Sequence, residues 1–252
     1  MRIRPGVELA SLTDVGCVRE NNEDSYIYWE PEGDELSTGL GRLAIVADGM
    51  GGYRGGEIAS QLAVETVKDV YAHSGESDVQ ECLLSAFSEA HRRIRERARA
   101  NPELSEMGTT CTALVLTDGQ AHFAHVGDSR LYFLSERKLR LLTRDHTLMA
   151  RWIENGVISS EEAETHPQRH VLTAALGVAE GIQPDSSPEA IQVQPGDVLM
   201  LCTDGLWGQV KEDEIQRTIS TCSPADACRI LCDLAKQRGG PDNITLQILR
   251  IT

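Results

Sequence analysis

The sequence predicts an α+β fold in which two mostly antiparallel β-sheets pack against each other and helices cover their outer faces. Strand-like apolar segments follow one another as hairpins and not as regular strand–helix–strand units, which favours antiparallel pairing. Long amphipathic segments of helical period come in pairs, as expected for helices that cover a sheet. No linker rich in Pro, Ser or Gly divides the chain, so residues 1–252 are expected to form a single domain.

Composition narrows the possible partners and the compartment. The chain has 24 Lys and Arg against 39 Asp and Glu, a net charge of −15, which argues against nonspecific binding to nucleic acid or anionic membranes. Its seven cysteines show no CxxC spacing, so a disulfide framework and a zinc ribbon are both disfavoured. No apolar run reaches membrane-spanning length. We therefore expect a cytoplasmic, monomeric protein with reduced, mostly buried thiols.

Three strands and then two helices are expected in the N-terminal half. The predicted strands span 7–14, 25–29 and 42–48, and the third is a short apolar run of the kind found in buried strands. The predicted helices span about 57–72 and 78–100 and carry apolar residues at helical spacing on one face. These apolar stripes are expected to belong to the core.

Hairpins dominate the next part of the chain. An Asp-Gly turn between two alternating apolar runs is a strong hairpin signal, and a second hairpin follows it. The expected strands are 111–117, 121–126, 131–134, 138–142, 198–203 and 244–251, and the expected helices are 212–220 and 224–238. Residues 144–170 differ, because two short helical patterns, 148–155 and 160–165, are broken by Gly156. We interpret this segment as an excursion from the core.

Residues 43–52 are central, because an apolar strand runs directly into Asp48 and a glycine-rich turn. An isolated Asp-Gly is usually a tight turn in which the Asp bonds its own backbone. This one is not isolated, because three further acidic motifs stand at predicted strand ends. Their carboxylates belong to Glu23, Asp24, Asp204 and Asp242.

Converging carboxylates that no Lys neutralises would repel one another, so they indicate bound metal. Mg²⁺ and Mn²⁺ prefer carboxylate, carbonyl and water oxygens. Two such ions about 3.5–4 Å apart can activate a shared water for in-line attack on phosphorus. Arg19, five residues before Asp24, supplies a cation suited to a phosphate dianion.

The motifs of serine hydrolases, P-loop NTPases, HExxH metalloproteases and EF-hands are missing from the sequence.

The histidines do not form a recognisable site in the sequence. His122 and His125 are three apart in a predicted strand and therefore on opposite faces, so structural roles are favoured for both. His146, His166 and His170 lie in or beside the excursion. For these three, the sequence leaves structural and functional roles open.

Six short motifs occur along the chain, and each combines polar side chains with Gly or Asn. They are Thr13-Asp14-Val15-Gly16…Arg19-Glu20-Asn21-Asn22-Glu23-Asp24, Ala47-Asp48-Gly49-Met50-Gly51-Gly52, Gly108-Thr109-Thr110, Gly127-Asp128-Ser129-Arg130, Thr203-Asp204-Gly205-Leu206-Trp207 and Asp242-Asn243-Ile244-Thr245. Their order resembles that of PPM-type (type 2C) metal-dependent serine/threonine protein phosphatases, particularly the compact bacterial ones. Each motif alone is weak, but six in order, from about residue 7 to the C-terminus, are highly specific.

The resemblance implies a four-layer α-β-β-α sandwich whose metal centre lies in a cleft at one end. By position, Asp48 would bridge two Mn²⁺ or Mg²⁺ ions, with the carbonyl of Gly49 as a further ligand. Asp204 and Asp242 would complete the first metal site, and Glu23 would contribute to the second.

The same resemblance assigns further roles around the metal centre. Asp24 would hold a metal-bound water, and Arg19 would bind the substrate phosphate. Bacterial relatives often bind a third metal, for which Asp128 together with Asp204 is the matching pair. The excursion 144–170 matches the flap beside the active site, which influences substrate access in this family.

The implied activity is hydrolysis of phosphoserine and phosphothreonine in proteins by direct attack of the metal-bridging water, in opposition to a bacterial Ser/Thr kinase. A departure concerns Met50, which stands where several eukaryotic relatives have a His proposed as general acid; a thioether cannot donate a proton.

The alternative function is a pseudophosphatase that binds partners without catalysis. It predicts the loss of a metal-binding acid, whereas Glu23, Asp48, Asp204 and Asp242 are all present.

Overall fold

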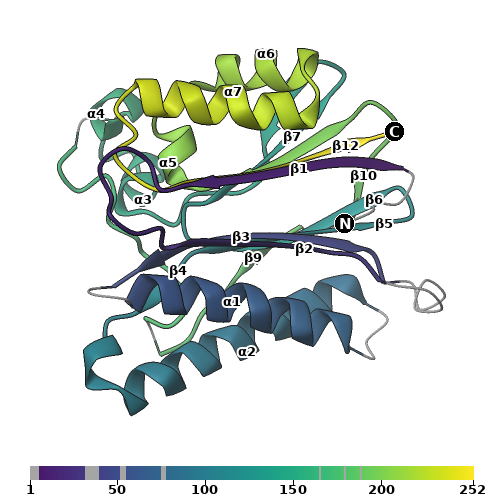
Figure 1. Ribbon diagram of the computed structural model, residues 1–252. Coiled ribbons are helices and arrows are strands. Elements are labelled where there is room, and N and C mark those ends of the chain that lie inside the picture. Colours follow the sequence, from purple (N-terminus) through teal and green to yellow (C-terminus); the bar gives the residue numbers. More distant parts are fainter. Residues whose placement is uncertain are drawn as a thin grey trace.

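The computed structural model describes residues 6–31, 40–51, 55–74, 78–164, 166–178, 180–187 and 189–252. Figure 1 shows four layers in these residues: a pair of helices, a sheet, a second sheet and a further pair of helices. The strand pairs that join the described strands are antiparallel. The predicted α-β-β-α sandwich is therefore confirmed. Gly52 of the central motif and Thr165, the expected end of a short helix, lie outside the described residues.

The first sheet has the strand order β1-β12-β11-β7-β8. Its strands are β1 (Val7–Asp14), β12 (Ile244–Ile251), β11 (Val198–Cys202), β7 (Arg130–Ser135) and β8 (Lys138–Leu141). Its outer face is covered by α6 (Glu212–Thr221) and α7 (Pro224–Gln237) (Figure 1). At the start of α7, Ser223 accepts a hydrogen bond from the N–H of Asp226, and Pro224 occupies a first-turn position that needs no N–H donor.

The second sheet has the order β10-β6-β5-β3-β2, with β4 paired to β3 and β9 paired to β6. Its strands are β10 (Ile191–Gln192), β6 (Gln120–Val126), β5 (Cys111–Thr117), β3 (Arg42–Met50), β2 (Asp24–Trp29), β4 (Gly108–Thr109) and β9 (Asp185–Ser186). Its outer face is covered by α1 (Gly55–Ala72) and α2 (Val79–Ala100), and the 3-10 helix η2 (Pro102–Leu104) follows α2. Asp78 caps α2 by accepting hydrogen bonds from the N–H groups of Gln80 and Glu81.

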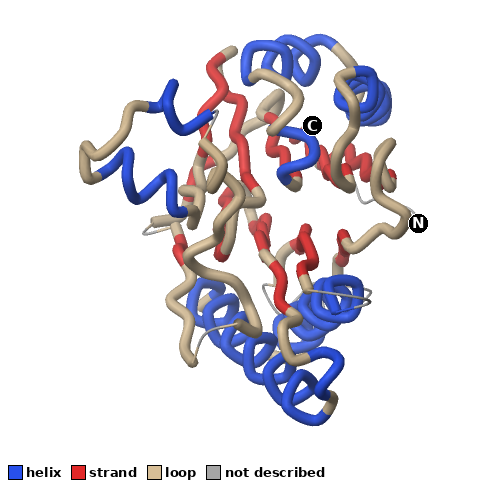
Figure 2. The backbone as a smooth tube through the Cα atoms, turned by 90° about the vertical axis from the view of Figure 1, so that its left-hand side faces the viewer, coloured by secondary structure: helices blue, strands red, loops and turns tan. Residues whose placement is uncertain are grey.

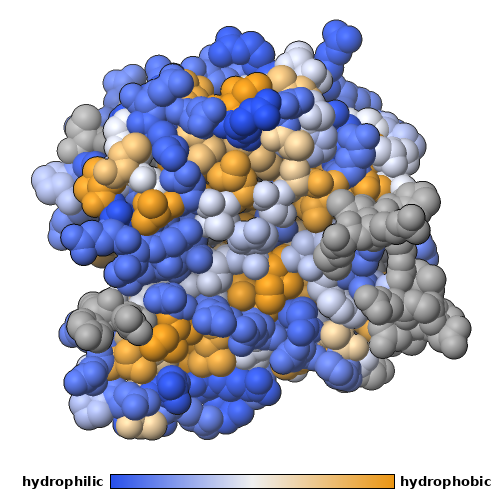
Figure 3. All heavy atoms as spheres, viewed as in Figure 1, coloured by the Kyte–Doolittle hydropathy of each residue, from blue (hydrophilic) through white to orange (hydrophobic). Residues whose placement is uncertain are grey.

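Three short helices lie at one end of the sandwich (Figure 1). The excursion contains the two expected helical segments, α3 (Leu148–Glu154) and α4 (Ser160–Glu164), and Figure 2 shows two short helices standing beside the layers. The third is α5 (Asp204–Trp207), a single turn after β11. None of the described helices is long and apolar enough to cross a membrane. On the face drawn in Figure 3, hydrophilic side chains cover most of the surface, with separate hydrophobic areas between them.

Apolar side chains fill three layers, one between the two sheets and one between each sheet and its helices. Along β3, Ile45 packs with the helix-facing layer, whereas Ala44 and Val46 pack between the sheets. A strand covered on both faces has no polar side, which explains its continuous apolar run in the sequence. Gln247 of β12 crosses the central layer and donates a hydrogen bond to the carbonyl of Ile45. The two sheets are therefore joined by a polar contact as well as by packing.

Two differences from the expected elements concern the centre of the fold. β3 does not end at Asp48 but continues to Met50, because Gly49 and Met50 pair with β4. Asp48 therefore lies within a strand and not at the start of the turn. The elements β4, β9, β10 and α5 were not predicted, because they are two to four residues long and too short to show a period.

Candidate metal centre

Five aspartates from separate segments meet at the end of the sandwich that carries α5. Asp24 begins β2 and pairs directly with Asp48 of β3. Asp128 lies between β6 and β7, Asp204 begins α5, and Asp242 precedes β12. Burial, and then repulsion from the other four aspartates, raises the pKa of Asp48 well above its usual value. The structure thus gathers the predicted acids around Asp48.

The surroundings of these carboxylates disfavour negative charge. Burial raises the pKa of Asp24 to about 7; Asp204 and Asp242 add repulsion, while hydrogen bonds from two threonines oppose the shift. Burial also raises the pKa of Asp128, and repulsion from Asp204 adds to the effect. The Oδ1 atoms of Asp24 and Asp204 are buried without a hydrogen-bond partner among the described residues. Bound cations would satisfy these oxygens and offset the repulsion.

The donor set suits hard divalent cations, because carboxylate and carbonyl oxygens are the protein ligands that Mg²⁺ and Mn²⁺ prefer. In the part of the chain that the structure describes, no three Asp, Glu, His or Cys side chains are already arranged as ligands of one ion. An ion held here would therefore take carbonyl or water oxygens as well as carboxylates.

Glu23 and Gly49 lie where β2, β3 and the start of α1 meet. The N–H of Gly49 donates to the carbonyl of Glu23 over 3.1 Å. A Cβ on Gly49 would lie 2.1 Å from the carbonyl oxygen of Gly56, so only glycine fits at this crossing. Burial raises the pKa of Glu23, while Arg19 lowers it and Asp242 raises it. Glu23 is therefore close enough to Arg19 and Asp242 to feel their charges.

Arg19 lies at the rim of the cluster. Its Nη2 donates to Oδ2 of Asp242 over 2.7 Å, and the two side chains are 51% and 30% exposed. The loop that carries Arg19 is held by Asn243, which donates to two loop carbonyls and accepts a hydrogen bond from the N–H of Glu23. This role of Asn243 could not be predicted from the sequence, because Asn243 and Glu23 are 220 positions apart.

Thr110, to which the sequence assigned no role, holds the main chain at Asp48, and the hydroxyl of Ser129 supports Thr110. The hydroxyl of Thr110 accepts from the N–H of Asp48 over 2.9 Å, and the N–H of Thr110 donates to the carbonyl of Asp48 over 2.9 Å. The Thr110 hydroxyl also lies 2.7 Å from the hydroxyl of Ser129, to which its proton remains available. These contacts fix the main chain of Asp48 and leave its carboxylate to the cluster.

Asp128 is held through its main chain. Nε1 of Trp207 donates to the carbonyl of Asp128 over 2.9 Å, and the guanidinium of Arg130 stacks 3.7 Å above the Trp207 ring. Arg130 also forms a bidentate pair with Asp145, at 3.0 and 2.7 Å. Because Asp145 lies at the start of the excursion, the turn with Asp128 is tied to that segment.

The structure places His125, His122 and His170 in different surroundings. His125 is fully buried and shares a hydrogen bond with Thr112; burial lowers its pKa to about 3, so it is neutral. His122 is half-buried on the opposite face of β6. His170 lies in the excursion, and its Nδ1 is 3.7 Å from Oδ2 of Asp204. The excursion therefore contacts the acidic cluster.

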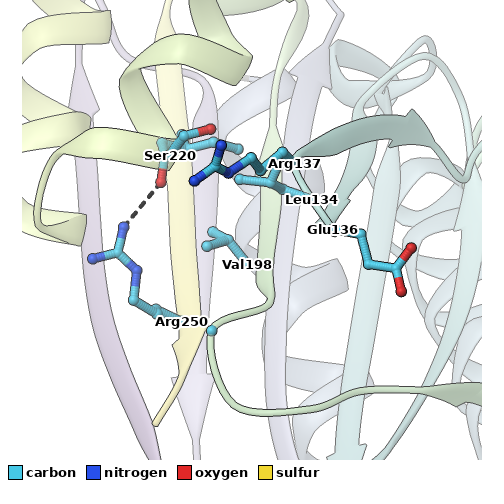
Figure 4. A pocket seen from close by; sticks show the side chains of 8 residues that line it. Leu134, Glu136, Arg137, Val198, Ser220 and Arg250 are labelled. Carbon is cyan, nitrogen blue, oxygen red and sulfur yellow. Dashed lines mark hydrogen bonds between the residues drawn. The ribbon is translucent and has the colours of Figure 1, made fainter.

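A hollow of about 120 Å³ on the first sheet contains none of these acids (Figure 4). Leu134, Val198 and Arg250 are among the residues that line it. Arg250 donates to the carbonyls of Ile219 and Cys222, so its charge already caps the C-terminal end of α6. We therefore place no site in this hollow.

Gly205 is expected to be required for the position of Asp204. A Cβ on Gly205 would lie 2.0 Å from the carbonyl oxygen of Asn243. We expect Gly205→Ala to cost about 1–3 kcal/mol of stability and to weaken stabilisation by Mn²⁺, because α5 must move away from the loop before β12. Thermal unfolding with and without Mn²⁺ measures both effects. Gly181→Ala is the control, because no atom lies within 4 Å of a Cβ built at Gly181. Equal unfolding temperatures for the two variants would contradict the close approach of Gly205 to the carbonyl of Asn243.

Known proteins are similar to this chain in sequence and in fold. A profile described as Protein phosphatase 2C matches residues 19–237. The chain is 34% identical over 242 residues to "Serine/threonine phosphatase stp" of Listeria monocytogenes, with 94% of this chain and 93% of that protein covered. The structure of the S. agalactiae serine/threonine phosphatase aligns with a TM-score of 0.89 and 32% identity, over 98% of this chain and 100% of that one. The catalytic domain of serine/threonine protein phosphatase PstP, solved in complex with two manganese ions, aligns with a TM-score of 0.85 and 30% identity, over 98% and 99%.

Proposed function

The chain belongs to the protein phosphatase 2C family of serine/threonine phosphatases, and on this premise we propose that it hydrolyses phosphoserine and phosphothreonine in proteins by direct attack of water, without a phosphoenzyme. The observation that carries the proposal is the meeting of four aspartates around Asp48, with Arg19 at the rim. The gathered carboxylates would repel a phosphate dianion. The phosphate can therefore bind only when cations lie between it and the carboxylates.

Two Mn²⁺ or Mg²⁺ ions would be held by Glu23, Asp48, the carbonyl of Gly49, Asp204 and Asp242. Such ions supply Lewis-acid activation of water and neutralise phosphate charge. A third ion would be held by Asp128 together with Asp204. The two manganese ions in the PstP relative support the metal requirement, and the buried Oδ1 of Asp204, which has no hydrogen-bond partner among the described residues, supports a cation beside it.

The remaining side chains bind and orient. Arg19 would bind the substrate phosphate, whose oxygens would replace the carboxylate of Asp242 as its partner and leave Asp242 to the metal. Oδ1 of Asp24 has no other partner among the described residues and would accept a hydrogen bond from the attacking water, which orients it. Met50 cannot protonate the leaving alkoxide, so that proton must come from water or from another side chain.

The substrates would be phosphorylated proteins, and the opposing enzyme would be a bacterial Ser/Thr kinase. We further propose that the chain works in the cytoplasm as a monomer, with one domain and a flap at 144–170 beside the site. The contact between His170 and Asp204 supports this position for the flap.

The direct test is hydrolysis of para-nitrophenyl phosphate and of a phosphothreonine peptide with Mn²⁺, with Mg²⁺ and with chelator. We expect activity with either ion and none in chelator, because the acids alone would repel the phosphate. Activity that survives chelation would overturn the two-ion proposal. A protein that is stabilised by Mn²⁺ yet hydrolyses neither compound would be a pseudophosphatase, the alternative function.

A further inference from the structure

We propose that His146 is a positioning residue that fixes the turn carrying Asp128, and that Asp185 orients its imidazole. The inference rests on the proposed function, because that function gives Asp128 a place in the metal centre. His146 lies near the start of the excursion, and its side chain is 7% exposed. It belongs neither to the acidic cluster nor to the six sequence motifs.

Both main-chain polar groups of Gly127, the residue before Asp128, bind His146. The N–H of His146 donates to the carbonyl of Gly127 over 2.7 Å, and the N–H of Gly127 donates to Nδ1 of the imidazole over 3.3 Å. A main-chain N–H can only donate, so Nδ1 must be the unprotonated nitrogen. Nε2 then carries the proton and faces Oδ2 of Asp185, 3.2 Å away, to which it can donate. Asp185 thereby selects the tautomer that Gly127 requires.

The turn has little room to move on its other side. Gly127 has φ +109°, and a Cβ there would lie 2.5 Å from the side chain of Thr110. Thr110 in turn holds the main chain of Asp48. Gly127 therefore lies between Thr110 on the side of Asp48 and His146 on the side of the excursion. Loss of the His146 contact would let Asp128 shift relative to Asp48.

His146 also joins the start of the excursion to the residues just after its end. Its carbonyl accepts a hydrogen bond from the N–H of Thr173 over 2.7 Å. The same segment carries His170, whose Nδ1 lies 3.7 Å from Oδ2 of Asp204. In addition to the Asp145–Arg130 pair, the excursion thus reaches the metal centre through His146 to Asp128 and through His170 to Asp204.

Asp185 is accessible enough to be changed without disturbing the core. It lies on β9, opposite His125 of β6, and its side chain is 37% exposed. Its Oδ2 also lies 3.6 Å from Nε of Arg144. The carboxylate lines an open groove of about 690 Å³, so solvent can occupy the space that a smaller side chain leaves.

Two amide substitutions separate the two contacts of the imidazole. Asn places its amide oxygen near the position of Nδ1, so His146→Asn keeps the acceptor for Gly127 and loses Asp185. Gln reaches to about the position of Nε2, so His146→Gln keeps a donor for Asp185 and loses the acceptor for Gly127. Hydrogen exchange of the Gly127 amide, followed by NMR in the metal-free protein, reports on the contact directly.

We expect the Gly127 amide to exchange slowly in the wild type and in His146→Asn, and much faster in His146→Gln. Calorimetric titration with Mn²⁺ should show binding about tenfold weaker for His146→Gln, the usual effect of losing a residue that orients a metal ligand. Equal exchange rates in the two variants, or faster exchange in His146→Asn, would overturn the proposal.

A second pair of variants tests the orienting role and guards against a failure of the His146 variants to fold. Asp185→Ala removes the acceptor for Nε2 and should speed exchange of the Gly127 amide, whereas Asp185→Asn retains an acceptor and should restore slow exchange. Unchanged exchange in Asp185→Ala would show that Asp185 does not orient His146. The exchange is measured without metal or substrate, so its outcome is separate from whether the wild type hydrolyses a phosphopeptide, which tests the proposed function.

Discussion

Asp48→Asn is expected to abolish metal-dependent hydrolysis and, at the same time, to stabilise the metal-free protein. Asp48 lies where burial and four neighbouring aspartates oppose its negative charge. A neutral amide of nearly the same shape requires neither a buried charge nor a bound proton in the folded state, so the free energy of unfolding in chelator should rise. The same change removes the proposed bridging ligand and with it several kcal/mol of transition-state stabilisation, so hydrolysis should fall ~10³-fold or more.

Thermal unfolding in chelator and in Mn²⁺, together with hydrolysis of a phosphothreonine peptide, measures both effects of Asp48→Asn. Asp118→Asn is the matched control, because Asp118 is exposed in the turn between β5 and β6 and should change neither quantity. A residue that only supports the fold would lose activity and stability together. A lower unfolding temperature for Asp48→Asn in chelator would therefore contradict the electrostatic account of the cluster.

The long elements of the fold could be predicted because each carries its own period. Strand β12 has the expected bounds, 244–251, and α2 begins one residue after Asp78, its cap. The end of β3 was misplaced, because its last residues pair with β4, which lies far along the chain. Such pairing is decided by the tertiary structure, and a two-residue strand is too short to show a sequence pattern from which it could be predicted.

The acids of the site could be found in the sequence, but their contacts could not. Asp24 and Asp48 stand out beside Gly and Asn, whereas their direct pairing depends on the register between β2 and β3. The bond between Arg19 and Asp242 joins residues 223 positions apart. The role of His146 depends on a turn contributed by another hairpin, so the sequence could only leave it open.

The metal-free protein is expected to lose stability as the pH rises from about 6.5 to about 8. The pKa of Asp24 is about 7 in the folded protein, against 3.8 for an unperturbed aspartate, and burial shifts the pKa of Asp48 and Asp128 in the same direction. In this range the folded protein holds protons that the unfolded chain has released. Raising the pH removes them and weakens the folded state by up to about 1.4 kcal/mol per pH unit for each carboxyl that is still protonated.

A buried histidine sets the lower limit of the pH range in which stability is expected to fall. Burial lowers the pKa of His125 to about 3, so below about pH 6.5 the unfolded chain binds a proton there that the folded protein does not. His125 therefore contributes stability that increases with pH up to that point, opposite in sign to the aspartates. Above about pH 6.5, His125 is neutral in the folded and the unfolded state, and the aspartates dominate the pH dependence of stability.

Thermal unfolding in chelator across this range, repeated with Mn²⁺, tests the pH dependence. Bound Mn²⁺ takes the place of the protons, so its stabilising effect should grow as the pH rises. Asp24→Asn should flatten the profile in chelator, because it removes the carboxyl that titrates near neutral pH, whereas Asp118→Asn should leave the profile unchanged. If the unfolding temperature in chelator instead rose toward about pH 8, the folded protein would be carrying these charges without penalty. A cation would then no longer be needed to balance them.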